Sequence, residues 1–218
     1  MVRRVLAAMS RAAGTTLSVG DGAPAGIGNG GSEPAELIVG GVFPVRPSVQ
    51  LYVFDEPSPD DDSADPRVIQ ATYEDLTGRT VRPNAEALVV QDGVVWIIDK
   101  QPDGPATLYR MEPTAGDADR GILTAESTLD LPGEQVTGAD LSPDGSVLAV
   151  RTTAAIRLYP VPEGADIATA LTGEPCVAPA PQEVQGESVA ILPGTQGLLT
   201  VSESETGDPV QLHLVAPG

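Results

Sequence analysis

The sequence predicts an all-β fold, a partial or small β-propeller of about three to four four-stranded blades. Four similar strings, centred on Tyr52, Tyr109, Tyr159 and His213, follow one another at spacings of 57, 50 and 54 residues. A repeat of about 40–50 residues is typical of a propeller blade. The chain also contains 24 Gly and 21 Pro with only 3% aromatic residues, which favours many short strands joined by turns over long helices.

Short apolar runs alternate with turn residues from residue 49 onward. Asp92-Gly93 and Asp144-Gly145 lie between such runs, and Asp-Gly predicts a hairpin because Gly takes the positive φ that tight turns require. The uninterrupted apolar run 94–98 fits a sheet that is covered on both faces. The expected strands are 49–54, 67–73, 86–90, 93–98, 107–111, 123–129, 136–141, 147–150, 156–160, 175–178, 187–192, 198–201 and 210–214.

The chain divides into two parts by composition. Residues 1–46 are Gly-rich and loosely patterned, with a strand signal only at 37–39, so we expect a flexible N-terminal segment. Residues 47–218 are expected to form the blades. Their approximate limits are 47–80, 81–132, 133–181 and 182–218. The last blade has no predicted fourth strand, and an exposed sheet edge of this kind would favour self-association.

Charge and cysteine content exclude several classes of function. A net charge of −19 repels nucleic acid and anionic membrane surfaces. No stretch approaches the roughly 20 apolar residues that span a bilayer. The apolar run within residues 1–9 is shorter than the apolar region of about 7–15 residues in a secretory signal, so the chain as written is expected in the cytoplasm. Cys176 is the only cysteine, which excludes an intramolecular disulfide and a multi-cysteine metal site.

The motifs of the common enzyme classes are absent from the sequence. It contains no P-loop, dinucleotide fingerprint, zinc-ligand spacing or Gly-x-Ser-x-Gly elbow, and His213 is the only histidine. A Ser-His-Asp hydrolase is therefore set aside. Three aromatic repeat positions, Tyr52, Tyr109 and Tyr159, are interpreted together with Trp96 as residues that pack blades against one another.

Acidic residues recur at the start of the innermost strands. Alignment of the copies places Glu86 and Glu187 at the same point, with Gly138 in the second copy and Asp140 two residues further on the same side. If Glu86, Asp140 and Glu187 converge on a central channel, they could bind Ca²⁺, which prefers oxygen ligands. Alternatively, these carboxylates line a water-filled channel or accept hydrogen bonds from strand-end amides, and no cofactor is required.

The ends of the second strands add further charges on the same face of the propeller. A rim formed by Glu86, Lys100, Arg151, Glu187 and Glu203 would bind a polar or phosphorylated ligand, with Lys100 and Arg151 as the anion contacts. The same charges could instead pair with one another as a structural network.

Three inner-strand strings, 84–88, 137–145 and 185–189, resemble motifs of WD40-like or NHL-like β-propeller proteins common in actinobacteria. These proteins overlap with propellers of phytase-like esterase activity. The resemblance covers roughly residues 46–217, and members of that group carry further blades upstream of this region. The resemblance implies a propeller fold, and its relatives are often exported; it identifies no substrate.

The sequence therefore predicts a non-catalytic propeller that presents an acidic funnel to a small polar ligand or a protein partner. The alternative is a calcium-dependent phosphoesterase, in which Glu86, Asp140 and Glu187 hold the metal while Lys100 and Arg151 bind the phosphate. A third hypothesis is a gene remnant without a stable fold.

Overall fold

The computed structural model describes residues 24–29, 36–41, 48–55, 67–102, 104–112, 119–183, 185–194, 196–202 and 211–216. Strands dominate this part of the chain, and its single helix, α1 (Ile167–Ala170), has four residues. No helix in these ranges is long and apolar enough to cross a membrane. The prediction of an all-β, partial propeller is confirmed.

The first blade consists of β1 (Pro24–Asn29), β2 (Glu36–Gly41), β3 (Ser48–Asp55) and β4 (Arg67–Glu74), with the short β5 (Thr80–Val81) beside β4. Strands β1 and β2 fall inside the segment that was expected to be flexible, so the first blade begins well before residue 47. Backbone N–H and C=O groups pair without help from side chains, which is why a Gly-rich segment can form strands. The rest of residues 1–46 lies outside the described residues.

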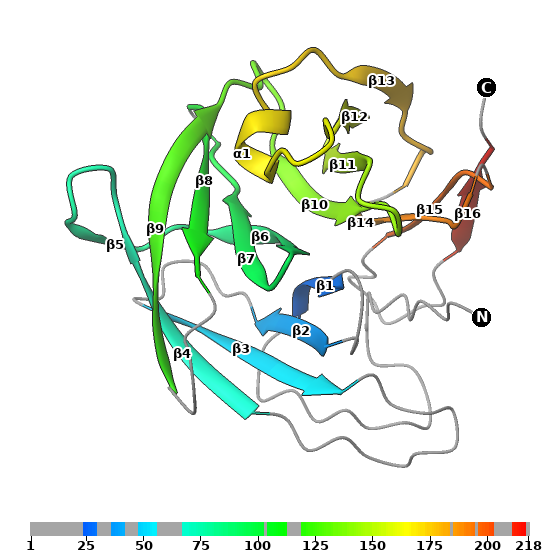
Figure 1. The fold of residues 1–218 in the computed structure, drawn as a ribbon. Helices are drawn as coiled ribbons and strands as arrows, with labels where there is room; N and C mark the ends of the chain where they lie inside the picture. Colours follow the sequence, from blue (N-terminus) through cyan, green and yellow to red (C-terminus); the bar gives the residue numbers. More distant parts are fainter. Residues whose placement is uncertain are drawn as a thin grey trace.

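The remaining blades follow in chain order (Figure 1). The second consists of β6 (Ala85–Gln91), β7 (Val94–Asp99), β8 (Ala106–Met111) and β9 (Arg120–Leu129). The third consists of β10 (Val136–Leu141), β11 (Val147–Thr152), β12 (Ala155–Pro160) and β13 (Cys176–Pro179), and the fourth of β14 (Gly186–Ile191), β15 (Leu198–Ser202) and β16 (Leu212–Val215). Every strand predicted from residue 49 onward is confirmed, with ends that differ by a few residues.

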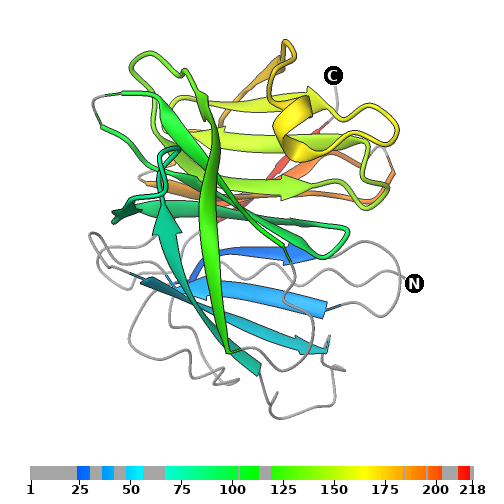
Figure 2. The ribbon, with the colours of Figure 1, turned by 60° about the vertical axis from the view of Figure 1, so that its left-hand side comes forward.

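The inner strands β1, β6, β10 and β14 lie next to one another in that order, and the blades extend outward from them (Figure 1). One pairing was not predicted. The outer strands β4 and β9 pair in parallel, from Gln70 opposite Arg120 to Glu74 opposite Thr124 (Figure 2). This pairing joins the outer edges of the first two blades into one continuous sheet.

The core is divided into layers between successive blades. Strand β7 shows this division because its buried residues alternate between two layers. Val95 and Ile97 belong to the layer between the first and second blades, whereas Trp96 and Ile98 belong to the layer between the second and third. A strand covered on both faces needs an uninterrupted apolar run, which confirms the interpretation of residues 94–98.

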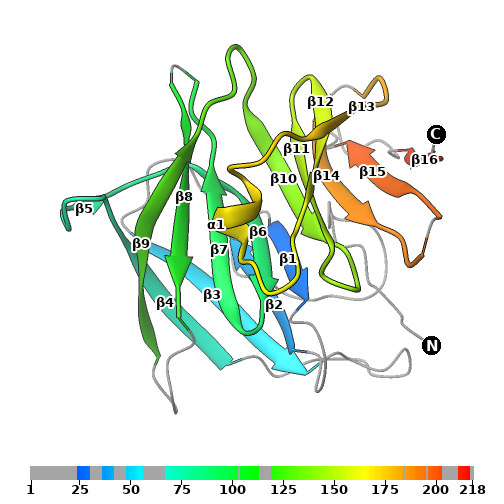
Figure 3. The same cartoon turned by 45° about the horizontal axis from the view of Figure 1, so that its top comes forward.

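The repeated tyrosines pack within these layers. Tyr109 lies in the first layer, where its ring meets that of Tyr73 edge-on at 5.1 Å, and Tyr159 lies in the second layer. The predicted packing role is therefore confirmed for Tyr109, Tyr159 and Trp96. Tyr52 is half-buried and donates a hydrogen bond to Gln50 Oε1. A third layer, between the third and fourth blades, is smaller, and the fourth blade lies at the end of the fold away from β8 and β9 (Figure 3).

Candidate functional site

A β-bulge recurs at the same point in the inner hairpins of all four blades, and those of the second, third and fourth blades concern the site. The register shifts between Ala85 and Ala87 in β6, between Val136 and Gly138 in β10, and between Gly186 and Ser188 in β14. Each bulge leaves one residue outside the ladder and redirects its side chain. These three residues are Glu86, Thr137 and Glu187.

The bulges correct the sequence alignment in the second copy. Thr137, rather than Gly138, is the structural equivalent of Glu86 and Glu187. Asp140 therefore lies three residues after the bulge residue of its own strand. A common position of Asp140, Glu86 and Glu187 around the channel stays a prediction.

Lys100 connects two of the bulge residues. Its Nζ lies 3.8 Å from Glu86 Oε1 in the second blade and 3.8 Å from Glu187 Oε1 in the fourth. The side chains of Lys100, Glu86 and Glu187 are 20%, 17% and 19% exposed, so the group is open to solvent while much of it is desolvated. We call these three residues the rim cluster.

Side-chain amides hold both carboxylates of the rim cluster. Asn84 Nδ2 donates to Glu86 Oε1 at 2.9 Å, and Gln185 Nε2 donates to Glu187 Oε1 at 2.7 Å. The backbone of Lys100 is fixed as well, because its N–H donates to the Asn84 carbonyl oxygen at 2.7 Å. These amides were not predicted from the sequence, although an amide residue stands two positions before the bulge residue in the second, third and fourth blades, at Asn84, Gln135 and Gln185.

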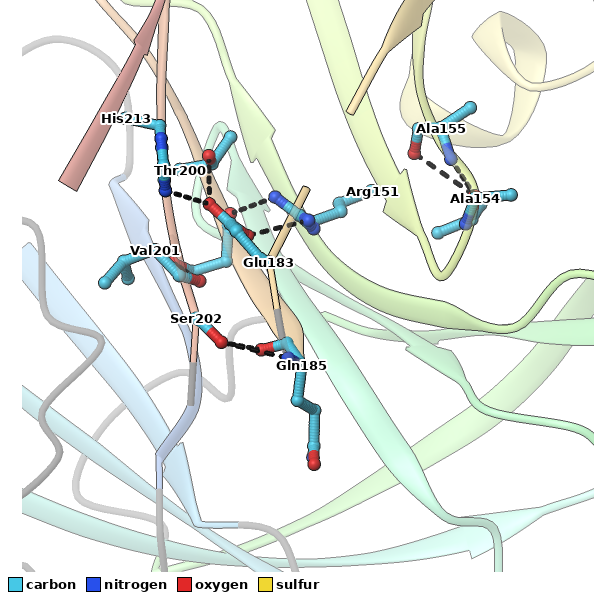
Figure 4. A network of polar contacts seen from close by, with 11 residues as sticks. Arg151, Ala154, Ala155, Glu183, Gln185, Thr200, Val201, Ser202 and His213 are labelled. Carbon is cyan, nitrogen blue, oxygen red and sulfur yellow. Dashed lines mark hydrogen bonds and ion pairs between the residues drawn. The ribbon is translucent and has the colours of Figure 1, made fainter. Parts of the chain in front are cut away.

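Arg151 does not present its charge at the rim. It is 3% exposed and its Nη2 lies 2.8 Å from Glu183 Oε2, a carboxylate whose side chain is 1% exposed (Figure 4). Thr200 Oγ1 donates to Glu183 Oε1 at 2.6 Å, and His213 Nε2 lies 3.8 Å from the same oxygen. Burial lowers the pKa of the Arg151 guanidinium, and the charges of Glu183 and Glu187 oppose that effect.

The buried Arg151–Glu183 pair also fixes the neighbouring strand. Arg151 Nη1 donates to the Ser188 carbonyl oxygen at 3.4 Å, and a Cβ atom on Gly186 would lie 1.7 Å from Arg151 Nη2. The pair therefore joins the third blade to the start of β14, immediately beside Glu187. Of the two predicted anion contacts, Lys100 alone lies at the rim. Glu183 was not predicted from the sequence.

The structure does not bring the three predicted calcium ligands together as a metal site. Asp140 accepts a hydrogen bond from the Ile191 N–H at 2.7 Å, whereas Glu86 and Glu187 share the Lys100 ammonium group. Within the described ranges, no group of three or more His, Cys, Asp or Glu residues is arranged to hold a metal ion. Calcium binding stays a prediction, and Glu203 lies outside the described residues.

The rim cluster offers both kinds of polar contact to a ligand. Its ammonium group can donate hydrogen bonds to a carbonyl oxygen or an oxyanion. Its two carboxylates can accept hydrogen bonds from hydroxyl groups or take a proton from water. Glu86 and Glu187 lie in the inner strands β6 and β14, and Lys100 directly follows β7, so the strands set the relative positions of the three residues.

Comparison with known proteins gives similarity of fold only. No protein-family model matches this chain, and no curated protein sequence matches it. A solved protein of Bacteroides uniformis assigned as a 6-phosphogluconolactonase is 15% identical with a TM-score of 0.40, covering 89% of this chain and 56% of that one. A Lactobacillus plantarum protein is 14% identical with a TM-score of 0.38, over 89% and 56%.

The periplasmic gluconolactonase of Pseudomonas aeruginosa is 12% identical with a TM-score of 0.41, and the match covers 88% of this chain and 58% of that one. The chain thus spans little more than half the length of these three solved proteins. The resemblance to WD40-like or NHL-like propellers stays a prediction, because no family model matches the chain.

Proposed function

We propose that the rim cluster binds a small polyhydroxylated compound and hydrolyses an ester or lactone bond in it. The observation that carries this proposal is the Lys100 ammonium group at 3.8 Å from two carboxylates of different blades, with all three side chains partly open to solvent. An ammonium group beside a carboxylate provides the two functions that ester hydrolysis requires, stabilisation of an oxyanion and proton transfer.

Either Glu86 or Glu187 acts as the general base. The carboxylate takes a proton from a water molecule, and the water oxygen attacks the carbonyl carbon. The carbonyl oxygen becomes an oxyanion that Lys100 stabilises. The tetrahedral intermediate then collapses, the bond to the leaving oxygen breaks, and the proton returns from the carboxylate to that oxygen. The products are a carboxylic acid and an alcohol, which in a lactone belong to one molecule.

Two of the solved structures above are named for a 6-phosphogluconolactonase and a gluconolactonase. These names suggest D-glucono-1,5-lactone as the first probe. The proposal itself depends on the rim cluster, because the similarity to those proteins concerns the fold.

The test is proton release from D-glucono-1,5-lactone at neutral pH, with the spontaneous rate subtracted. Lys100→Met is expected to lower kcat by about 10²–10³-fold, the usual loss when one oxyanion donor is removed, and Glu86→Gln and Glu187→Gln identify the base. Arg79→Met is the matched control because Arg79 is 80% exposed and its ion pair is with Asp75, which lies outside the rim cluster. Since Lys100 is the only lysine, acetylation, which removes the charge of its ammonium group, provides a second test without mutation.

A wild-type protein that does not accelerate lactone hydrolysis would contradict the proposed reaction. Binding of the probe without turnover would then favour the non-catalytic binding protein that the sequence predicted. The calcium-dependent alternative is tested separately by thermal melts with added calcium and with a chelator. We expect no shift, because the Lys100 ammonium group already lies 3.8 Å from both Glu86 and Glu187 and would repel a cation there. A rise in Tm with calcium would follow from metal binding to the folded state and would favour the metal-dependent alternative.

A further inference from the structure

Thr137 is the bulge residue of the third blade, and it differs from Glu86 and Glu187 in having no hydrogen-bond partner among the described residues. Glu86 and Glu187 each accept a hydrogen bond from the amide two residues before them. Thr137 is only 2% exposed, and its Oγ1 has no hydrogen-bond partner among the described residues. A buried hydroxyl group without a partner costs stability, so its presence at this position needs a reason.

The bulge that contains Thr137 lies beside the bulge that contains Glu187. The inner strand β10 lies between β6 and β14, and a Cβ atom on Gly138 would lie 2.8 Å from the carbonyl oxygen of Glu187. The bulge of β10 is therefore packed directly against the bulge of β14. Glu86 and Glu187 reach Lys100 from the blades on either side, and Thr137 occupies the equivalent point of the blade between them.

Thr137 is much more buried than the three charged residues. The rim side chains are 17–20% exposed, whereas Thr137 is almost completely covered. Its hydroxyl group is therefore far less accessible to solvent than the three charges. Asn84 Oδ1, which belongs to the amide that holds Glu86, is a second buried atom without a hydrogen-bond partner in this part of the described structure.

We propose that the Thr137 hydroxyl group binds an oxygen atom of the ligand and determines which compounds the rim cluster accepts. The inference rests on the proposed function of that cluster. A ligand whose hydroxyl or carboxylate oxygen reaches Thr137 completes the hydrogen bonding of the buried hydroxyl group, whereas a ligand with a methylene group at that point leaves it unpaired. Discrimination against compounds without that oxygen follows from the cost of leaving a buried polar group unpaired.

The test compares Thr137→Val, which has nearly the same shape without the hydroxyl group, with Thr137→Ser, which keeps it. Binding of gluconate, the hydrolysis product of the lactone probe, is measured by calorimetry in the full chain. Loss of one hydrogen bond is expected to weaken binding by Thr137→Val about tenfold. Thr137→Ser is expected to bind within about threefold of the wild type.

Thermal unfolding without ligand distinguishes a ligand-binding hydroxyl group from a structural one, because the two predict opposite changes in the Tm of Thr137→Val. If the hydroxyl group is unpaired in the free protein, Thr137→Val raises Tm by about 2–4 °C, the shift for roughly 1 kcal/mol in a chain of this size. A structural hydrogen bond would instead make Thr137→Val less stable than the wild type, and this would overturn the proposal.

The failure of this inference can be told apart from the failure of the proposed reaction. Gluconate binding that depends on Thr137, in a protein that does not hydrolyse the lactone, supports the role of Thr137 and rejects the reaction. Lactone hydrolysis with equal gluconate affinity in Thr137→Val and the wild type rejects the role of Thr137 and leaves the reaction standing. Absence of gluconate binding in the wild type rejects the role of Thr137.

Discussion

The buried ion pair between Arg151 and Glu183 gives the sharpest prediction for stability. Replacement of Arg151 by Met keeps the volume of the side chain and removes its charge. Among the described residues, Glu183, whose side chain is 1% exposed, would then keep only the Thr200 hydroxyl group at 2.6 Å and the His213 imidazole at 3.8 Å. The variant therefore leaves a carboxylate buried without its main counter-ion.

The expected magnitude follows from this geometry. Removal of one partner from a buried ion pair costs about 3–5 kcal/mol, because the remaining charge stays desolvated. In a chain of this size that loss lowers Tm by roughly 6–20 °C. The double variant Arg151→Met/Glu183→Met has no buried charge at this point, so it is expected to lose far less, and it is expected to be more stable than Arg151→Met.

Urea unfolding of the wild type, both single variants and the double variant measures the coupling directly. A coupling energy of several kcal/mol is expected between the two positions. If Arg151→Met unfolds within about 1 kcal/mol of the wild type, the pair does not hold the third and fourth blades together and the reasoning is refuted. Arg79→Met serves again as the control, because its ion pair with Asp75 is exposed and worth at most about 1 kcal/mol.

Two further predictions concern the inner strands and a buried acid. Gly138→Ala places a Cβ atom 2.8 Å from the Glu187 carbonyl oxygen, so we expect a loss of about 1–3 kcal/mol in unfolding free energy and slower lactone hydrolysis. Gly104→Ala is the control, because its Cβ atom meets no atom within 4 Å. Asp99 is fully buried and burial raises its pKa above 3.8, so its ionisation removes stability as the pH rises from 3.8 through the raised pKa. Urea unfolding at several pH values should show Asp99→Asn gaining stability relative to the wild type over that interval; an unchanged difference would contradict the prediction.

The strands were predictable because the signal for each of them is local. Alternation of apolar residues, Asp-Gly turns and the repeat spacing all act within a few residues, and they placed every described strand from β3 onward except β5. Strands β1 and β2 were not predicted in full, because Gly-rich strands pair through the backbone and leave no side-chain pattern. The parallel pairing of β4 with β9 joins residues about fifty positions apart, and no local pattern encodes it.

The rim cluster was predicted in part. Glu86, Lys100 and Glu187 were brought together because strand ends on one face of a propeller converge, whatever the details of packing. Arg151 was misplaced for a reason that the sequence does not show. Its counter-ion Glu183 precedes the inner strand of the next blade, so the guanidinium group is directed between blades and away from solvent.

The register of strand pairing explains why the sequence repeat predicted the packing of the tyrosines correctly but misplaced the bulge residue of the third blade. Between the second and third strands of the second blade, Tyr109 pairs with Ile97. At the equivalent register, the third blade has Arg157 opposite Val150, and the fourth has His213 opposite Thr200. The tyrosine string of the third blade is therefore shifted by two residues relative to the second. A shift of two keeps a strand residue on the same face, so both tyrosines still pack between blades.

The inner strands show the opposite case. There the alignment was wrong by a single residue, which exchanged Thr137 for Gly138. The bulges of the second, third and fourth blades lie at the same point of their hairpins, and an amide residue precedes each of these three bulge residues by two positions. That spacing is visible in the sequence, so a search for an amide followed by a polar residue two positions later would have identified Thr137 beside Glu86 and Glu187. Sheet packing tolerates an error of two residues in a repeat alignment, whereas a site at a bulge tolerates none.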